Sequence, residues 1–319
     1  MSESHIEHPV RVFFYALGSV VIFAIMNILA KMAVAECSVA QIIFFRNAFA
    51  FIPILWLIKH TGGWNLLKTK NHLGHFWRGI VGIVSMSCFF ISFAMLPMAN
   101  ATSIHFASPL ILTILAIPLL GEQVGRARWT AVIVGLCGVL FMLKPETGGD
   151  AEHLTGSLVA LAAAFLAAFA MIFVRKLGRT EHAMTIVFYF SLYGTIMGAL
   201  AMIFMWNPIG PLTLFLLIMT GLLGGVGQTF LTYAYASAPA SYVAPFSYFA
   251  MVIAILADIL VWGIWPDWRI YVGCPVIIGS GLFIVYRESL KKKSVTVRAN
   301  VYGLPPASPT ERDEKENSI

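Results

Sequence analysis

The sequence predicts an all-α membrane protein with ten transmembrane helices. Ten apolar stretches of helix length, separated by short loops, occupy nearly all of the chain between Arg11 and Arg287. Hydrophobic residues make up 59% of the chain and charged residues only 11%. Because a helix that crosses a hydrocarbon layer needs roughly 20 mostly apolar residues, this composition leaves little chain for other structures.

Each predicted helix is an apolar stretch bounded by polar or turn-forming residues. Residues 158–174 are apolar on every side, whereas a helix of a large soluble bundle carries a polar stripe. A β-barrel would alternate polar and apolar residues over strands of about ten residues, and the sequence lacks that alternation. The predicted spans are 11–33, 38–58, 74–95, 100–120, 128–143, 154–174, 183–205, 212–236, 240–262 and 269–287.

The distribution of positive charge predicts the orientation. With the N-terminus in the cytoplasm, only Lys31, Lys144 and Arg269 of the 21 lysines and arginines fall on the outer side, and Arg46 lies within a span. All the others fall on the cytoplasmic side, as the positive-inside rule requires. We therefore expect both termini to be cytoplasmic.

The chain is expected to contain two repeats joined by a short linker. The predicted parts are a cytoplasmic N-terminal arm (1–10), a first five-helix repeat (11–143), an outer linker (144–153), a second five-helix repeat (154–287) and a disordered cytoplasmic tail (288–319). The tail is rich in lysine, proline and mixed charges, a composition that cannot bury a core.

The repeats are weakly similar and inverted. Residues 94–120 align with 234–260 at an offset of 140, and Gly138-Val139-Leu140-Phe141 matches Gly281-Leu282-Phe283-Ile284. Since each half has five helices, an odd number, the second half lies upside down in the membrane relative to the first. Inverted repeats are typical of transporters, in which two similar halves rock around a site near the midplane.

Several short motifs, in their order and spacing, carry a family resemblance over about residues 10–287. The chain resembles the drug/metabolite transporter superfamily, in its ten-helix EamA-type branch. The residues that carry the resemblance are Phe44-Phe45-Arg46, Arg78-Gly79, Ser108-Pro109, Leu120-Gly121-Glu122, Trp129 and Gly138-Val139-Leu140. The second half departs from the family pattern at Val261-Trp262-Gly263, where a Gly-Glu pair is expected.

One subgroup is more similar than the rest. Leu143-Lys144-Pro145, Ala244-Pro245 and Trp265-Pro266-Asp267 resemble segments of the S-adenosylmethionine carriers of intracellular bacteria. The resemblance implies a secondary transporter that moves a small organic metabolite across the inner membrane by alternating access. S-adenosylmethionine or a related amino-acid-like or nucleoside-like solute is the implied substrate. The alternatives are an exporter of amino acids or drugs and a non-transporting membrane scaffold.

Other classes of function find little support in the sequence. The net charge of +6 follows from the cytoplasmic lysines and arginines, so it does not indicate a nucleic-acid partner. The four cysteines suggest neither a disulfide framework nor a metal site. Metalloprotease and nucleotide-binding motifs are missing from the sequence. We expect no enzyme activity and no cofactor; the expected partners are a small-molecule substrate and the lipid bilayer, with the protein a monomer or a homodimer.

Arg46 is the strongest candidate for a functional residue inside the membrane. Its helix begins near Ser38, which places Arg46 roughly 12 Å below the outer surface, too deep for easy snorkelling. A charge at this depth is costly unless it is paired. Arg46 therefore either binds an anionic group of the substrate or clamps neighbouring backbone carbonyls.

His105 and Asp258 form a second candidate pair. Both lie about 8 Å from the outer ends of their helices, so equal depth permits contact when the outer side is closed. Such a pair is expected to gate the outer mouth or to exchange a proton. The alternatives are a packed histidine and an aspartate that reaches water or a hydroxyl group.

Further polar residues lie in the predicted spans. Asn27 and Gln228 lie near the middle of their helices, where an amide binds substrate or holds two helices together. Ser108, Tyr242 and Tyr248 complete the expected substrate-binding set. The expected helix hinges are Pro109, Pro118 and Pro245, because proline removes a backbone donor and kinks a helix.

Overall fold

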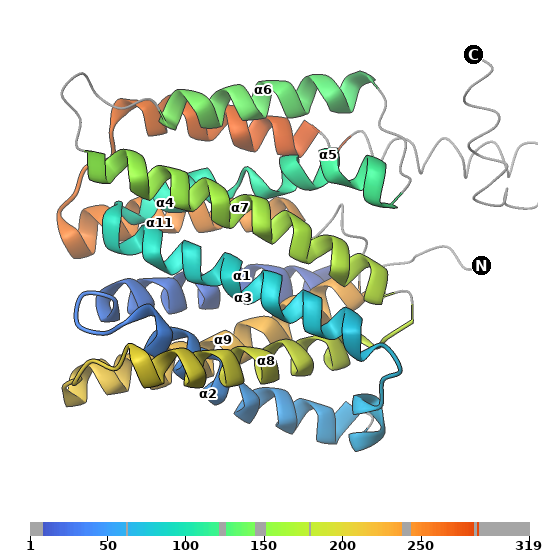
Figure 1. Cartoon of the computed structure of the whole chain (residues 1–319). Coiled ribbons are helices and arrows are strands. Elements are labelled where there is room, and N and C mark those ends of the chain that lie inside the picture. Colours follow the sequence, from blue (N-terminus) through green and yellow to red (C-terminus); the bar gives the residue numbers. More distant parts are fainter. Residues whose placement is uncertain are drawn as a thin grey trace, which may run out of the picture.

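The computed structural model describes residues 9–61, 63–120, 126–143, 151–178, 180–237, 244–283 and 286. Within these ranges the chain forms helices, turns and loops and no strand, and the helices lie roughly side by side along one direction (Figure 1). The helices are α1 (Pro9–Ala33), α2 (Val39–Thr61), η1 (Trp64–Leu67), α3 (His72–Met95), α4 (Met98–His105), α5 (Ser108–Leu120), α6 (Arg126–Leu143), α7 (Ala151–Leu177), α8 (Ala183–Phe204), α9 (Pro211–Ser237), η2 (Ala244–Tyr248), α11 (Phe249–Trp262) and a last helix, Trp268–Phe283.

The helices have the length and composition of membrane spans. Seven described helices are long and apolar enough to cross a membrane, with α4 and α5 counted together, and three shorter apolar helices cover Trp129–Met142, Phe246–Trp262 and Trp268–Phe283. Large apolar side chains face outward, among them Phe204, which is 87% exposed. Lipid is the solvent that suits such a surface. The prediction of an all-α membrane protein is confirmed, whereas crossing by the three shorter helices stays a prediction.

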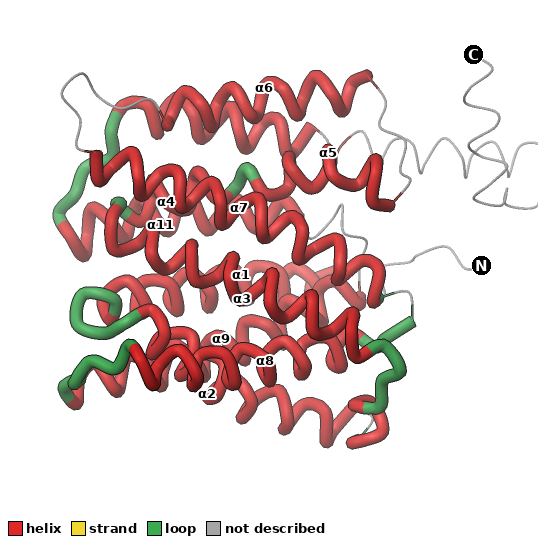
Figure 2. The backbone as a smooth tube through the Cα atoms, in the orientation of Figure 1, coloured by secondary structure: helices red, strands yellow, loops and turns green. Residues whose placement is uncertain are grey.

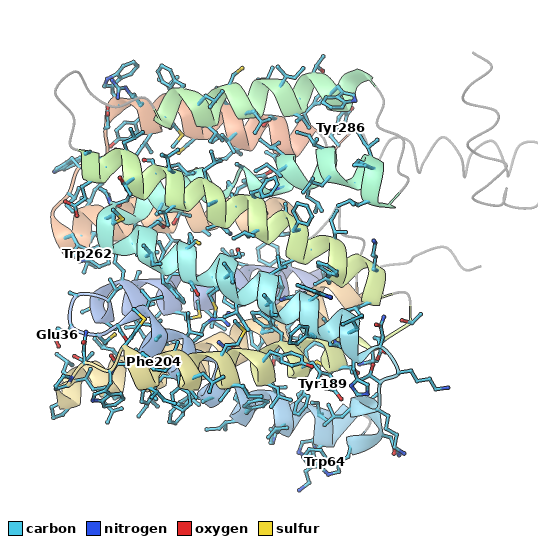
Figure 3. The ribbon with its side chains drawn as sticks, in the orientation of Figure 1. Glu36, Trp64, Tyr189, Phe204, Trp262 and Tyr286 are labelled. Carbon is cyan, nitrogen blue, oxygen red and sulfur yellow. The ribbon has the colours of Figure 1, made fainter. Side chains whose placement is uncertain are left out.

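The described turns gather at the two ends of the bundle. Residues 34–38, 205–210 and 263–267 lie at one end, and residues 63–71 and 180–182 lie at the other (Figure 2). We call these the Lys31 end and the Glu181 end. Glu36, Phe204 and Trp262 mark the first end in Figure 3, and Trp64 and Tyr189 lie toward the second.

Local sequence signals set several helix boundaries. The Asn71 side chain accepts a hydrogen bond of 3.0 Å from the Gly74 backbone N–H and so caps α3. Gly263 ends α11 with φ of +66°, a left-handed conformation that glycine adopts without a steric penalty. Pro211 is the first residue of α9, where the missing N–H is tolerated.

The predicted helix over 100–120 is not continuous in the structure. It divides into α4 and α5 at Phe106 and Ala107, seen as a short loop between two helices in Figure 2. Pro109 has no N–H to donate to the His105 carbonyl, and the Ala107 N–H bonds instead to the Ile104 carbonyl, three residues back, at 3.0 Å. The missing donor explains the interruption beside one of the expected hinges.

Helices from the two halves of the sequence pack directly on each other. The pairs in contact include α1 with α9, α2 with α8 and α9, α3 with α7, and α4 with α11. Glycines permit the close approach: a Cβ on Gly198 of α8 would lie 2.7 Å from the Phe44 backbone N of α2. Small residues at helix contacts are the usual means of tight packing in membranes. The interior is therefore shared by both halves.

Candidate functional site

Arg46 lies on α2 and points into the interior between helices. Its side chain passes beside Gly224 of α9, with Cγ 3.6 Å from the position of a Cβ there. Nη1 contacts the Asn47 side-chain oxygen at 3.4 Å, and the guanidinium carbon lies 6.0 Å from the Phe190 ring centre. The Nε atom is buried and has no hydrogen-bond partner. One alternative from the sequence was that Arg46 bonds to neighbouring backbone carbonyls; its Nε atom makes no such bond.

Arg78 approaches the same aromatic ring from α3. Its guanidinium carbon lies 4.1 Å from the centre of the Phe190 ring, so the charge rests over the ring face. The side chain fills the space beside Gly82, where an added Cβ would collide with Nη1. Both Nε and Nη1 of Arg78 are buried without a hydrogen-bond partner. The charge distribution predicts that Arg78 lies on the cytoplasmic side, but its guanidinium group lies inside the bundle.

Arg46 and Arg78 thus form a cluster of positive charge around Phe190. The two guanidinium carbons lie 6.0 and 4.1 Å from the same ring centre, and the described residues provide neither with an ion pair. The three residues come from α2, α3 and α8 and so from both halves of the chain. We call Arg46, Arg78 and Phe190 the arginine cluster.

Asp258 lies at the Lys31 end, where three helices meet. Its carboxylate is fully buried and accepts hydrogen bonds from the backbone N–H groups of Met98 at 2.9 Å and Ala99 at 2.6 Å. These are the first two residues of α4, so the carboxylate caps the positive end of that helix.

Lys31 of α1 completes this junction. Its Nζ atom lies 3.3 Å from the Asp258 carboxylate and donates to the Leu96 carbonyl at 3.2 Å. The same ammonium group lies 4.6 Å from the Trp262 ring centre. We call Lys31, Asp258 and the start of α4 the polar junction. It ties α1 and α4 of the first half to α11 of the second.

His105 does not meet Asp258 in this structure. Asp258 caps the first residue of α4, whereas His105 is the last residue of that helix, seven residues further on. Its ring packs against Phe89 with 4.5 Å between ring centres, and its Nδ1 atom is buried without a partner. The expected contact between the two residues when the outer side closes stays a prediction.

The other expected binding residues are dispersed through the interior. Asn27 and Gln228 are half-buried on α1 and α9, and Ser108 is half-buried at the start of α5. Tyr248 is half-buried in η2, and its hydroxyl group lies against Gly281 of the last helix. Tyr242 lies outside the described residues.

The gap between α4 and α5 lies in contact with the 3₁₀ turn η2. The ring of Phe106, at the gap between α4 and α5, lies 5.4 Å from the ring of Tyr248 in η2. Pro109 is the second residue of α5, Pro118 lies within α5, and Pro245 lies within η2. Two of the three expected hinges therefore lie beside the points where α-helical geometry changes.

A second set of polar contacts links helices at the Glu181 end. The Thr69 hydroxyl group donates to Glu181 at 2.6 Å, and His75 lies 3.8 Å from the same carboxylate. The Tyr189 hydroxyl group donates to the Leu67 carbonyl at 3.1 Å. These contacts join η1 and the start of α3 to α8 and the segment before it.

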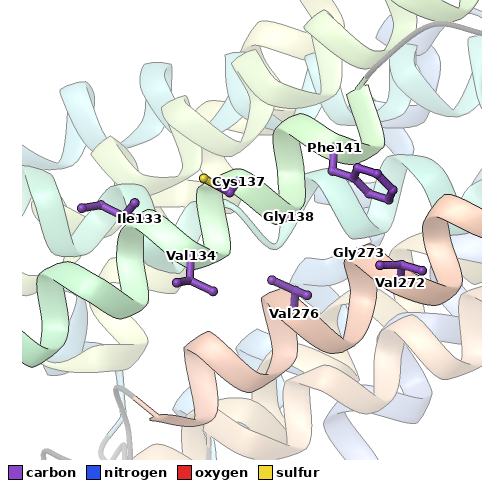
Figure 4. Close-up of a pocket in the computed structure, with 8 residues that line it drawn as sticks. All are labelled: Ile133, Val134, Cys137, Gly138, Phe141, Val272, Gly273 and Val276. Atoms are coloured by element: carbon purple, nitrogen blue, oxygen red, sulfur yellow. The ribbon is translucent and has the colours of Figure 1, made fainter.

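An apolar groove lies on the surface between α6 and the last helix (Figure 4). Aliphatic, aromatic, thiol and glycine positions line it, and no side chain there offers a charge or an amide group. A metabolite site needs a few placed polar groups, so this groove is not the substrate site. The lining residues are Ile133, Val134, Cys137, Gly138, Phe141, Val272, Gly273 and Val276.

Metal ligation finds no support in the described part of the chain. No group of three His, Cys, Asp or Glu side chains is placed there to hold an ion. Cys37, Cys88, Cys137 and Cys274 are all free thiols.

Sequence reasoning missed Lys31 and Arg78. The charge distribution predicts only that Lys31 lies on the outer side, whereas the structure places it in the last turn of α1, at the depth of Asp258. Arg78 stands six residues after the first residue of α3, about 9 Å along the helix. That depth, with a glycine one turn later, was the signal in the sequence that Arg78 lies inside the bundle.

The fold and its buried polar groups define an α-helical integral membrane protein. The model of the EamA-like transporter family matches residues 10–144 and 154–286, so the chain belongs to that family. The resemblance found in the sequence is thereby confirmed. The family matches the chain twice, once in each half.

Three curated relatives show the range of the family. The chain is 31% identical over 267 residues to the pseudopaline exporter CntI of Pseudomonas aeruginosa, covering 82% of this chain and 89% of that one. It is 30% identical over 281 residues to the S-adenosylmethionine uptake transporter of Rickettsia prowazekii, covering 88% and 93%. It is 30% identical over 297 residues to the riboflavin transporter of Vibrio cholerae, covering 92% and 98%.

A solved structure shares the fold. A protein crystal structure with 17% sequence identity aligns with a TM-score of 0.61 over 85% of this chain and 96% of that chain. At this level of identity the likeness concerns the fold alone.

Proposed function

We propose that the protein is a secondary transporter that moves a small organic metabolite across the inner membrane by alternating access. Ten helices, arranged as two inverted five-helix repeats with both termini in the cytoplasm, make up the proposed architecture. The double family match, the seven long and three shorter apolar helices and the positive-charge asymmetry support it.

The observation that carries the proposal is the arginine cluster. Arg46 and Arg78 hold charged groups inside a membrane bundle, and the described residues provide neither with an ion-pair partner; such groups mark substrate or ion pathways. Because the cluster draws on α2, α3 and α8, movement of one half against the other changes its shape. Asn27, His105, Ser108, Gln228, Tyr242 and Tyr248 are the further proposed substrate contacts.

The polar junction is the proposed gate on the outer side. In the proposed topology the Lys31 end faces outward, and Asp258 joins α4 to α1 and α11 there. Opening the mouth requires Asp258 to leave the α4 N-terminus or Lys31. Contact between His105 and Asp258 when the outer side is closed is part of the proposal; the alternative is that His105 is a packed residue.

The relatives frame the choice of substrate. S-adenosylmethionine or a related amino-acid-like or nucleoside-like solute is the first candidate, supported by the Rickettsia uptake transporter. The pseudopaline exporter supports the opposite direction of transport. A monomer or homodimer is proposed.

Counterflow into proteoliposomes tests the proposal. Vesicles loaded with unlabelled S-adenosylmethionine, riboflavin or amino acids are diluted into a trace of the labelled compound. A carrier accumulates label transiently and saturably. A channel gives no transient accumulation, and a scaffold gives no flux above that of empty vesicles, so either result would contradict the proposal.

A further inference from the structure

Arg46 and Arg78 present hydrogen-bond donors that the described protein leaves unused. Arg46 Nε, Arg78 Nε and Arg78 Nη1 are all buried from solvent and unpaired. Among the described residues, the one polar contact of the Arg46 guanidinium is long, at 3.4 Å, and goes to the neutral Asn47.

This arrangement is unfavourable for the protein alone. A buried charge without an ion-pair partner is costly, and two like charges beside the same ring add to that cost. The fold nevertheless makes room for the Arg78 side chain, since a Cβ on Gly82 would collide with its Nη1 atom.

Stacking on Phe190 accounts for only part of the arrangement. A guanidinium over an aromatic ring is attracted to the ring face, and the Arg78 guanidinium carbon lies 4.1 Å from the Phe190 ring centre. Its Nε and Nη1 atoms have no hydrogen-bond partner, so they remain available to a planar acceptor. In a structural clamp these donors would bond to backbone carbonyls. Arg46 Nε, Arg78 Nε and Arg78 Nη1 make no such bond.

We propose that Arg46 and Arg78 form an anion clamp that binds a carboxylate or phosphate group of the transported metabolite. The substrate is therefore an organic acid, a zwitterion or a phosphate ester rather than a neutral solute. Paired arginines bind such oxygens through charge-assisted hydrogen bonds. This inference rests on the proposed function and specifies the class of substrate that it moves.

Thermal unfolding of the purified protein with matched probes tests the clamp. The pairs are S-adenosylmethionine and its decarboxylated form, methionine and its methyl ester, adenosine monophosphate and adenosine, and riboflavin phosphate and riboflavin; acetate and inorganic phosphate are added alone. We expect the member of each pair that carries the carboxylate or phosphate group to raise the melting temperature, and the partner that lacks the group not to raise it. A response to the carboxylates identifies an acid as substrate, and a response to the phosphates identifies a phosphate ester.

Two variants connect the response to the cluster. Arg46→Gln and Arg78→Gln should each weaken binding of the responding anion by about tenfold or more, whereas Arg269→Gln, the control, should not, because Arg269 lies beside Asp267 away from the cluster. Without ligand, both cluster variants should melt at or above the wild-type temperature, since each removes a repelled buried charge. A structural role would lower that temperature instead.

Specific results would overturn the clamp. It fails if no probe with a carboxylate or phosphate group stabilises the protein, if a probe that lacks the group stabilises it as well as its partner, or if Arg46→Gln and Arg78→Gln unfold early and bind normally. Counterflow of a neutral probe that survives both substitutions would leave the carrier proposal intact and remove only the clamp. Anion binding without any counterflow would do the reverse.

Discussion

Lys31 and Asp258, 227 positions apart in sequence, form a buried contact of 3.3 Å that joins the first helix to α11. Asp258 also accepts two backbone hydrogen bonds from the start of α4. One carboxylate thus accepts hydrogen bonds from an ammonium group and from two backbone N–H groups at the start of a helix. The four bonded groups belong to three helices, so a change at this point reaches both halves of the molecule.

Asp258→Asn should destabilise the protein by about 3 kcal/mol, because it leaves Lys31 as an unpaired buried charge. Lys31→Met should cost less, since the α4 N–H groups still pair with Asp258. Thermal unfolding in detergent measures the loss of stability in both variants. Arg269→Gln, which breaks the partly exposed Arg269–Asp267 pair, is the control. Equal melting of Asp258→Asn and wild type would show that the contact contributes nothing.

Gly198→Ala should destabilise the protein by about 1–3 kcal/mol, because its Cβ would lie 2.7 Å from the Phe44 backbone N. Gly279→Ala in the last helix is the matched control, since open space surrounds that position. The control should be neutral or slightly stabilising, as alanine favours a helix. Similar melting temperatures for the two variants would mean that α2 and α8 do not pack as closely as described.

The sequence predicts the helices better than their partners. Apolar length specifies where a chain enters and leaves the membrane, and α2, α3, α8 and α9 begin within a few residues of their expected starts. The same pattern also predicts that Arg46 is a charged residue deep in the membrane. Hydropathy carries no information about which way a side chain points around its helix, so it gave no reason to place Arg78 beside Arg46.

Depth in the membrane alone was also insufficient to predict the partner of Asp258. Equal depth favoured His105, but several residues share that depth, and only the packing of α1 against α11 selects Lys31. The division of α4 from α5 depends on a local signal, Pro109, whose effect on a membrane helix ranges from a slight kink to a complete interruption. Tertiary contacts decide between these outcomes.

The proposed topology predicts opposite labelling of two exposed loop positions. With native cysteines replaced, a cysteine at Pro208 should react with an impermeant maleimide added to intact cells. One at Asn65 should react only after the cells are opened. Pro208 and Asn65 are exposed at opposite ends of the bundle. Labelling of the Asn65 position in intact cells would reverse the assigned orientation.

Native Cys37 should label poorly although it lies in the loop at the Lys31 end. Burial, with the nearby Glu36 charge, raises the pKa of the Cys37 thiol to about 12. A raised pKa lowers the thiolate fraction at neutral pH, so the reaction should be about tenfold slower or more than at an exposed cysteine. Maleimide labelling at several pH values checks this. A fast reaction at pH 7 would show that the loop opens readily.

The most direct test of alternating access is transport by a protein whose outer junction can be locked. Lys31→Cys and Asp258→Cys are combined in a background without native cysteines, and His105→Cys with Asp258→Cys provides the comparison pair. Counterflow is measured before oxidation, after oxidation and after reduction. The account predicts that the Lys31–Asp258 pair cross-links, that oxidation stops transport and that reduction restores it. Full transport by the cross-linked protein would contradict it.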